Sequence, residues 1–251
     1  MLVLREWRRL IWWPGLAFVA VFTILEIGQF DRTIANAFFY RPGAGWLGEG
    51  AGDWWARDVI HQGGRWLPRC VATLAGVGWL ASFGVAALKP WRRELLYVFC
   101  GMALVIGLVG GLKELTNVDC PWDLAGFGGT NPYVPLFGDR PNGLKHAACF
   151  PAAHSSSGFA LLAIYFALRG RLPRAARIAF WAALAIGVTF AFAQEARGAH
   201  FFSHDFTSAA LAWLILAWMY SAMLAPKPAL QVKPGEREGQ QAGGQTANDV
   251  A

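Results

Sequence analysis

Three histidines and two cations are spaced so that they can meet on one side of a membrane. Lys113 stands at the end of a long apolar segment, and His154 stands at the start of the next one. Arg197, His200 and His204 fall in the short stretch before the last apolar segment. Ionisable groups near a bilayer are costly and are usually retained for a function. Imidazoles that attack phosphorus or move protons, beside cations that hold phosphoryl oxygens, predict a phosphate-handling site.

The composition indicates that membrane helices position these residues. Of the 251 residues, 55% are hydrophobic and 15% are charged, whereas a soluble domain has about a quarter charged residues. The apolar residues are also gathered into runs instead of following an amphipathic spacing. Both features exclude an ordinary soluble domain and predict an all-α, polytopic membrane protein.

Six apolar runs approach the roughly 17–25 residues that cross the hydrocarbon core as a helix. The runs are approximately 10–28, 70–88, 95–112, 155–168, 178–193 and 206–225. The fourth and fifth runs are short, so we expect their helices to extend into the flanking loops. The runs predict a bundle of six transmembrane helices over residues 1–226. Residues 227–251 are rich in Gly, Gln, Pro and charge without periodicity, which predicts a disordered tail.

The distribution of Lys and Arg predicts which ends of the helices face the cytoplasm. With the N-terminus inside, the inner segments hold Arg5, Arg8, Arg9, Lys89, Arg92, Arg93, Arg169, Arg171, Arg174, Arg177, Lys227, Lys233 and Arg237. Both termini are then cytoplasmic, and all five histidines lie on the outer side. The net charge of +6 reflects this topology and favours attraction to anionic lipid. It gives no reason to expect nucleic acid as a partner.

In this topology, the fourth and sixth helices begin at the outer face. A helix N-terminus presents free N–H groups and a partial positive charge, and both favour phosphate binding. His154 lies at the first of these N-termini, and Ser203 is the predicted N-cap of the second. His61 and His146 also lie on the outer side, in loops where we expect no chemical role for them.

Two of the four cysteines, Cys120 and Cys149, lie in the second outer loop. A disulfide is permitted outside the cytoplasm. Closing a loop of this length stabilises a protein by roughly 3–4 kcal/mol in the chain-entropy model. We therefore predict a Cys120–Cys149 disulfide, with two free thiols as the alternative.

Three short blocks of sequence, taken in order, resemble the type-2 phosphatidic acid phosphatase family. The blocks are Lys113-Glu-Leu-Thr-Asn-Val-Asp-Cys120-Pro121, Phe150-Pro-Ala-Ala-His154 and Arg197-Gly-Ala-His200-Phe-Phe-Ser-His204. The family signature is Lys, six residues, Arg-Pro; then Pro-Ser-Gly-His; then Ser-Arg, five residues, His, three residues, Asp. The resemblance covers about residues 95–225, and the order of the blocks and their placement at helix ends agree with it.

The resemblance implies a role for each matched residue. His200 resembles the nucleophile that attacks phosphorus and forms a phosphohistidine. His154 resembles the general acid that protonates the leaving oxygen and later activates water. Lys113 and Arg197 resemble the cations that bind the phosphoryl oxygens. This chemistry needs no metal and no cofactor, because fixed cations stabilise the charged transition state.

The chain departs from the signature at several positions. Cys120 stands in place of an arginine, and Arg140 in the same loop is a candidate replacement for that phosphate ligand. Ala152 and Ala153 replace Ser and Gly, so the serine hydroxyl is absent. Arg197 precedes the nucleophile by three residues instead of six.

A further departure concerns the residue that orients the nucleophile. His204 stands where the signature has an aspartate, and a residue four positions along a helix can share a face with His200. Asp205, one residue further on, is the second candidate, and Glu195 is the third. The spacing favours His204.

These features predict an inner-membrane lipid phosphatase of a bacterium, with its site facing the periplasm. Candidate substrates are undecaprenyl diphosphate, phosphatidylglycerophosphate, phosphatidic acid and the phosphates of lipid A. A lipid phosphotransferase that uses the same intermediate is one alternative. A second is a membrane protein in which His154, His200 and His204 bind a metal or haem, and a third is a relative that binds phospholipid without catalysis. The oligomeric state does not follow from the sequence.

Overall fold

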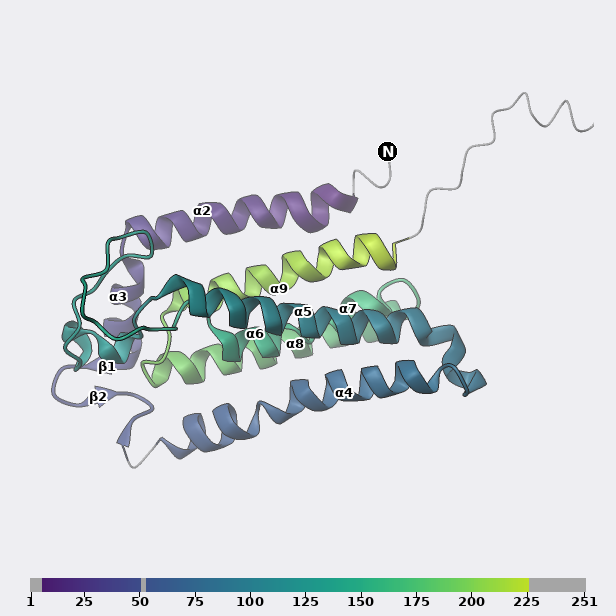
Figure 1. Cartoon of the computed structure of the whole chain (residues 1–251), viewed down its shortest axis with the longest axis horizontal. Helices are drawn as coiled ribbons and strands as arrows, with labels where there is room; N and C mark the ends of the chain where they lie inside the picture. Colours follow the sequence, from purple (N-terminus) through teal and green to yellow (C-terminus); the bar gives the residue numbers. More distant parts are fainter. Residues whose placement is uncertain (1–5, 51–52, 226–251) are drawn as a thin grey trace, which may run out of the picture.

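The computed structural model describes residues 6–50 and 53–225, so the predicted tail at 227–251 lies outside the described residues. The helices of the bundle are η1 (Arg8–Trp12), α2 (Trp13–Ile27), α4 (Trp66–Ala81), α5 (Arg92–Thr116), α6 (Ala153–Phe159), α7 (Leu162–Leu168), α8 (Pro173–Ala196) and α9 (Phe202–Met223). They run side by side along the molecule, with α2 and α4 at opposite sides of the bundle (Figure 1).

The connecting segments gather at one end of the bundle, which we call the loop end (residues 28–50, 53–65, 117–152 and 197–201) (Figure 1). Its elements are α3 (Phe30–Ile34), η2 (Ala35–Phe39), β1 (Tyr40–Arg41), β2 (Gly45–Trp46), η4 (Trp55–Gly63), η6 (Pro121–Asp123) and η7 (Ala125–Phe127). At the other end, η5 (Ala86–Trp91) joins α4 to α5. The antiparallel hairpin pairs Tyr40 with Trp46 and Arg41 with Gly45.

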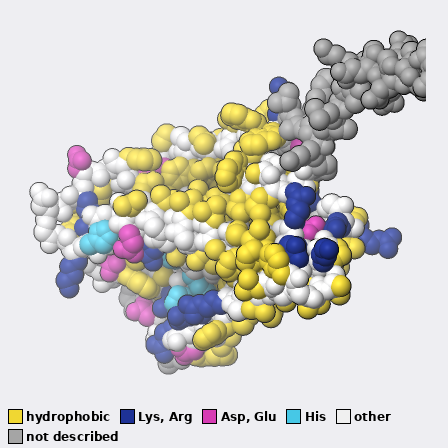
Figure 2. All heavy atoms as spheres, turned by 45° about the vertical axis from the view of Figure 1, so that its right-hand side comes forward, with side chains coloured by type: hydrophobic (Ala, Val, Ile, Leu, Met, Phe, Trp, Pro, Cys, Tyr) yellow, Lys and Arg dark blue, Asp and Glu magenta, His cyan; other side chains and the backbone are white. Residues whose placement is uncertain are grey.

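The described chain is a helical membrane protein, as predicted. Four helices are long and apolar enough to cross a membrane: Arg8–Ile27, Ala86–Asp123, Pro173–Ala196 and Phe202–Met223. By this criterion the predicted count of six is not reached, because α4 has 16 residues and the apolar helix Ala153–Leu168 is shorter than the others. Figure 2 shows a broad area of hydrophobic side chains, with Lys and Arg gathered towards the ends and histidines at one end.

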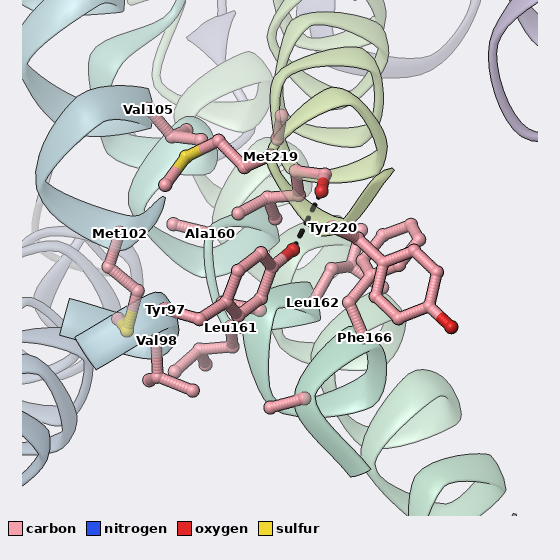
Figure 3. Packing of buried hydrophobic residues seen from close by; sticks show 14 of the residues in the cluster. Tyr97, Val98, Met102, Val105, Ala160, Leu161, Leu162, Phe166, Met219 and Tyr220 are labelled. Carbon is pink, nitrogen blue, oxygen red and sulfur yellow. Dashed lines mark hydrogen bonds between the residues drawn. The ribbon is translucent and has the colours of Figure 1, made fainter. Parts of the chain in front are cut away.

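The bundle is held by close packing of side chains between α5, α6, α7 and α9. Fully buried Tyr97 donates a hydrogen bond from its hydroxyl to the carbonyl of Leu216 (2.7 Å), which satisfies a polar group inside the bundle (Figure 3). Small residues let helices approach closely in a membrane. A Cβ on Gly158 of α6 would lie 2.9 Å from the Cα of Gly187 in α8. The absence of a side chain at Gly158 lets the last turn of α6 pack closely against α8.

The predicted N-cap of the last helix is wrong. The N-cap of α9 is Phe201, and no side chain of that residue caps the helix. Instead, Asp31 of α3 accepts a hydrogen bond from the backbone N–H of Ser203 (2.8 Å) and another from the Ser203 hydroxyl. A remote carboxylate therefore occupies this helix N-terminus, where the sequence predicts phosphate binding. Burial outweighs the opposing effect of the hydrogen bonds from Ser203, and the pKa of Asp31 is raised to about 6.

The predicted disulfide between Cys120 and Cys149 is present. It joins the segment that follows α5 to the segment that precedes α6. The backbone N–H of Cys149 also donates to the carbonyl of Val118 (3.1 Å). These links hold the ends of α5 and α6 next to each other at the loop end.

Candidate active site

A cavity of about 290 Å³ opens at the loop end between α4, α5 and α6. Its wall brings together Lys113, His154 and His200, which come from three separate segments of the chain. The remaining lining residues are His61, Arg65, Pro68, Arg69, Ile106, Ala153, Ser157 and Gln194. The cavity therefore collects three imidazoles and three cationic side chains beside the membrane-spanning part of the protein.

His200 lies in the tight turn between α8 and α9. Gly198 has a φ of +70°, a conformation that favours glycine, and a Cβ there would collide with the indole of Trp46. The N–H groups of Gly198 and Ala199 donate to the carbonyls of Glu195 and Gln194 (2.9 Å each). The turn is thus fixed by backbone contacts, and it holds His200 at 5% exposure.

Burial lowers the pKa of His200 well below its usual value of 6.5. The imidazole of His204 and the charge of Lys113 lower that pKa further. His200 is therefore neutral at neutral pH, so one ring nitrogen keeps the lone pair that a nucleophile needs.

His154 is the second residue of α6, and neighbouring rings hold its imidazole in place. It stacks on Phe190 of α8 (centroids 4.3 Å apart, planes at 19°) and meets the ring of His61 edge-on (4.6 Å, 63°). Its Nε2 is buried and has no hydrogen-bond partner among the described residues. The ring is therefore fixed in position, and Nε2 is left available for a proton or a substrate oxygen.

The two predicted phosphate-binding cations are placed differently. Lys113, in the last turn of α5, lines the cavity and acts electrostatically on His200. Arg197 lies behind the wall, where its guanidinium donates to the side-chain oxygen of Gln194 (2.9 Å). Burial lowers the pKa of Arg197. Gln194 lines the cavity and precedes His200 by six residues, which is the spacing of the signature arginine.

Arg140, the candidate replacement for the missing arginine, does not line this cavity. Its guanidinium pairs with the carboxylate of Asp119 (2.8 Å), and Asn131 donates to the same carboxylate (2.8 Å). Arg140 also donates to the backbone carbonyl of Lys145 (2.8 Å). The structure therefore engages Arg140 in holding the loop between α5 and α6.

Of the three candidates for orienting the nucleophile, His204 is the one whose ring packs against His200. The two ring centroids are 5.8 Å apart and the planes are nearly perpendicular (66°). The backbone carbonyl of Cys149 lies beside both imidazoles. Asp205 faces Ser155 and Glu195 instead, so these two carboxyl groups lie next to each other inside the bundle.

Three residues of the cavity wall were missed at the sequence level: His61, Arg65 and Arg69. They repeat at intervals of four, a spacing that places side chains on one face of a helix, and this was the signal that could have found them. His61 had been expected to have no chemical role because it falls in a long loop. His146, given the same expectation, is exposed and pairs with Glu114 (3.7 Å).

The site does not resemble a metal centre. Among residues 6–50 and 53–225, no group of three or more His, Cys, Asp and Glu side chains is arranged to hold a metal ion. The cations around His154 and His200 would also repel one. The geometry therefore gives no support to the metal or haem alternative.

Comparison with known proteins identifies the family. The family model for the PAP2 superfamily matches residues 94–227, which include Lys113, His154 and His200. No curated protein and no solved structure matches the chain. The family match spans more than half of the 251 residues and covers the three signature blocks in order. The chain therefore belongs to the PAP2 superfamily.

Proposed function

We propose that this membrane phosphatase removes a phosphate from a lipid monophosphate or diphosphate through a phosphohistidine on His200, without a metal. The observation that carries the proposal is the convergence of His200, His154 and Lys113 on one cavity. An attacking group, a proton carrier and a cation at one place are the parts that phosphoryl transfer requires.

The reaction has two steps. In the first, a ring nitrogen of His200 forms a bond to phosphorus, the bond from phosphorus to the leaving oxygen breaks, and His154 gives that oxygen a proton. In the second, His154 takes a proton from water, the water oxygen attacks phosphorus, and the bond to His200 breaks to release inorganic phosphate. Lys113 stabilises the phosphoryl charge in both steps.

His204 is the proposed positioning residue for the nucleophile. It packs against the His200 ring from the first turn of α9 (centroids 5.8 Å apart), which restricts how that ring can turn. A neutral imidazole in place of a carboxylate orients the ring of His200 by packing and supplies no negative charge to stabilise its protonated form.

The lipid is proposed to enter from the bilayer, with its headgroup in the cavity. Pro68 of α4 and Ile106 of α5 line the cavity on its membrane side, and the Ile106 side chain is partly exposed. We further propose six spans, with α4 and the α6–α7 pair completing the four longer helices. Both termini are then in the cytoplasm of a bacterium, and the loop end faces the periplasm.

The test is phosphate release from a panel of lipid phosphates by purified protein in detergent with EDTA. His200→Ala should lower turnover by at least roughly a thousandfold because the covalent route is lost. The matched control is His146→Ala, a histidine of the loop end that is exposed and does not line the cavity. Trapped phosphate on His200 would support the proposal, and full activity of His200→Ala would overturn it.

A further inference from the structure

One wall of the active-site cavity comes from a segment that lies outside the family match. His61 lies in the last turn of η4, Arg65 follows it by four residues, and Arg69 lies in the first turn of α4. Gly64, between the two elements, fixes their position, because a Cβ there would lie 2.7 Å from the ring of Phe190. Phe190 is also the ring on which His154 stacks. The segment is therefore built against the catalytic residues.

This segment faces His154 more closely than His200. The ring of His61 contacts the ring of His154 (4.6 Å), and the backbone carbonyl of Ile60 lies beside the same imidazole. Burial, together with the nearby charges of Arg197 and Arg65, lowers the pKa of His61 to about 4. Since His154 serves the leaving oxygen, His61 and Arg65 lie on the leaving-group side of the reacting phosphorus.

The two guanidiniums of this wall are available to a ligand. No carboxylate pairs with Arg65 or Arg69 in the part of the chain that the structure describes. By contrast, Arg57, one turn before His61 in η4, is paired with both Asp53 and Asp58 (3.2 and 3.0 Å). Unpaired guanidiniums beside a cavity favour an anionic ligand, and phosphate is a group that arginine binds well.

We infer that His61, Arg65 and Arg69 form a second anion subsite, which binds a phosphate carried by the leaving group. The preferred substrate is then a lipid diphosphate. A lipid monophosphate ester would place an uncharged alcohol oxygen on this side, so the guanidiniums of Arg65 and Arg69 would have no anionic group to bind. The inference rests on the proposed function and adds to it the substrate class.

In this reaction His200 bonds to the terminal phosphorus, and the bond from that phosphorus to the bridging oxygen breaks. The electron pair stays on the bridging oxygen, which leaves as part of the lipid monophosphate. Arg65 and Arg69 stabilise the charge that develops there, and His154 supplies the proton. Water then cleaves the phosphohistidine, so the products are a lipid monophosphate and inorganic phosphate.

The experiment compares farnesyl diphosphate with farnesyl monophosphate in micelles of a neutral detergent. The wild-type protein should have the larger kcat/KM for the diphosphate. Arg65→Gln and Arg69→Gln should each reduce the ratio of the two values by roughly ten- to a hundredfold, the range of a lost charge-assisted hydrogen bond. Arg57→Gln is the matched control, because that paired arginine does not line the cavity.

Several outcomes would overturn the inference. Equal losses on both substrates would mean that Arg65 and Arg69 hold the reacting phosphoryl group. Losses that occur only when anionic lipid is added would mean that they bind the membrane surface. An unchanged ratio, or a wild-type preference for the monophosphate, would also contradict a leaving-group subsite.

A binding measurement separates this inference from the proposed catalytic route. A farnesyl methylene-bisphosphonate, which cannot be hydrolysed, should raise the unfolding temperature of His200→Ala and raise it much less after Arg65→Gln is added. This result would support the subsite even if His200 proved not to be the nucleophile. No stabilisation of either variant by the bisphosphonate would overturn the subsite whatever the catalytic result.

Discussion

Two segments of the molecule that meet at the loop end use arginine in different ways. In the segment between α5 and α6, Arg140 is part of the disulfide-closed loop and is held by Asp119 (2.8 Å). In the segment that leads into α4, Arg65 and Arg69 face the cavity. The difference shows that the partner of a cation decides whether the cation serves the fold or a ligand. Proximity in sequence to a signature block does not decide it.

The largest expected effect concerns the proton carrier that lies between the two segments. His154→Ala should lower kcat by roughly 10²–10⁴-fold, the usual contribution of a general acid–base group. His61→Ala should lower it less, because His61 acts through its contact with the His154 ring. A larger loss for His61→Ala would make His61 the proton carrier, and steady-state kinetics on one substrate settles the order.

Removing Arg140 should affect stability and leave substrate preference unchanged. The ion pair of Arg140 and Asp119 is partly buried, with side chains 12% and 6% exposed, so removing one partner should cost less than the roughly 3–5 kcal/mol of a fully buried pair. Arg140→Gln should therefore lower the unfolding temperature, and Asp119→Asn in the same chain should restore part of the loss. A lower preference for diphosphate at normal stability would instead place Arg140 in the substrate site.

Opening the disulfide should destabilise the segment between α5 and α6 without changing the segment that leads into α4. The Cys120–Cys149 bond closes a loop of sequence separation 29, which corresponds to about 3–4 kcal/mol in the chain-entropy model. The double variant with Cys120→Ser and Cys149→Ser should lower the unfolding temperature by the amount that corresponds to this free energy. Cys70→Ser with Cys100→Ser is the control, because those two cysteines are free. Equal stability of the two double variants would contradict a structural role for the bond.

The pH dependence of activity tests the state of His200. Its pKa lies well below 6.5 because of burial, so protonation removes the nucleophilic lone pair only at a pH well below 6.5. The kcat/KM for farnesyl diphosphate should therefore remain high as the pH falls through 6.5. An acid limb centred at 6.5 or above would show that the nucleophile is an ordinary exposed histidine.

The smallest effect is the contribution of His61 to stability. Its pKa falls from 6.5 to about 4 on folding, so the unfolded chain binds the proton more readily. Its contribution is therefore fully present above pH 6.5 and is lost as the pH falls from 6.5 towards 4. His61→Asn should flatten that part of the stability curve, measured by unfolding temperature. A curve identical to that of the wild type would place His61 in contact with water.

The residues proposed to attack and bind phosphate could be predicted from the sequence because they stand at fixed places relative to the apolar runs. Lys113 and His154 stand at the ends of apolar runs, and the structure places both in one cavity with His200. The helical membrane architecture, the family and the Cys120–Cys149 disulfide were also predicted and are confirmed. The six spans and the chemical roles remain predictions, because helix length does not establish a membrane span and a place in the cavity wall does not establish a chemical role.

The remaining features depended on partners that are distant in the chain. Asp31 occupies the start of α9 from 172 residues away, so the cap could not be read from the residues around Ser203. Arg140 is engaged by Asp119 across the loop, and Arg65 reaches the cavity because Gly64 packs on Phe190. The sequence by itself determined which segments enter the membrane and which residue types stand at their ends. Only the tertiary structure decided which charges are paired and which face a ligand, because charge pairing depends on contacts between segments that local spacing does not specify.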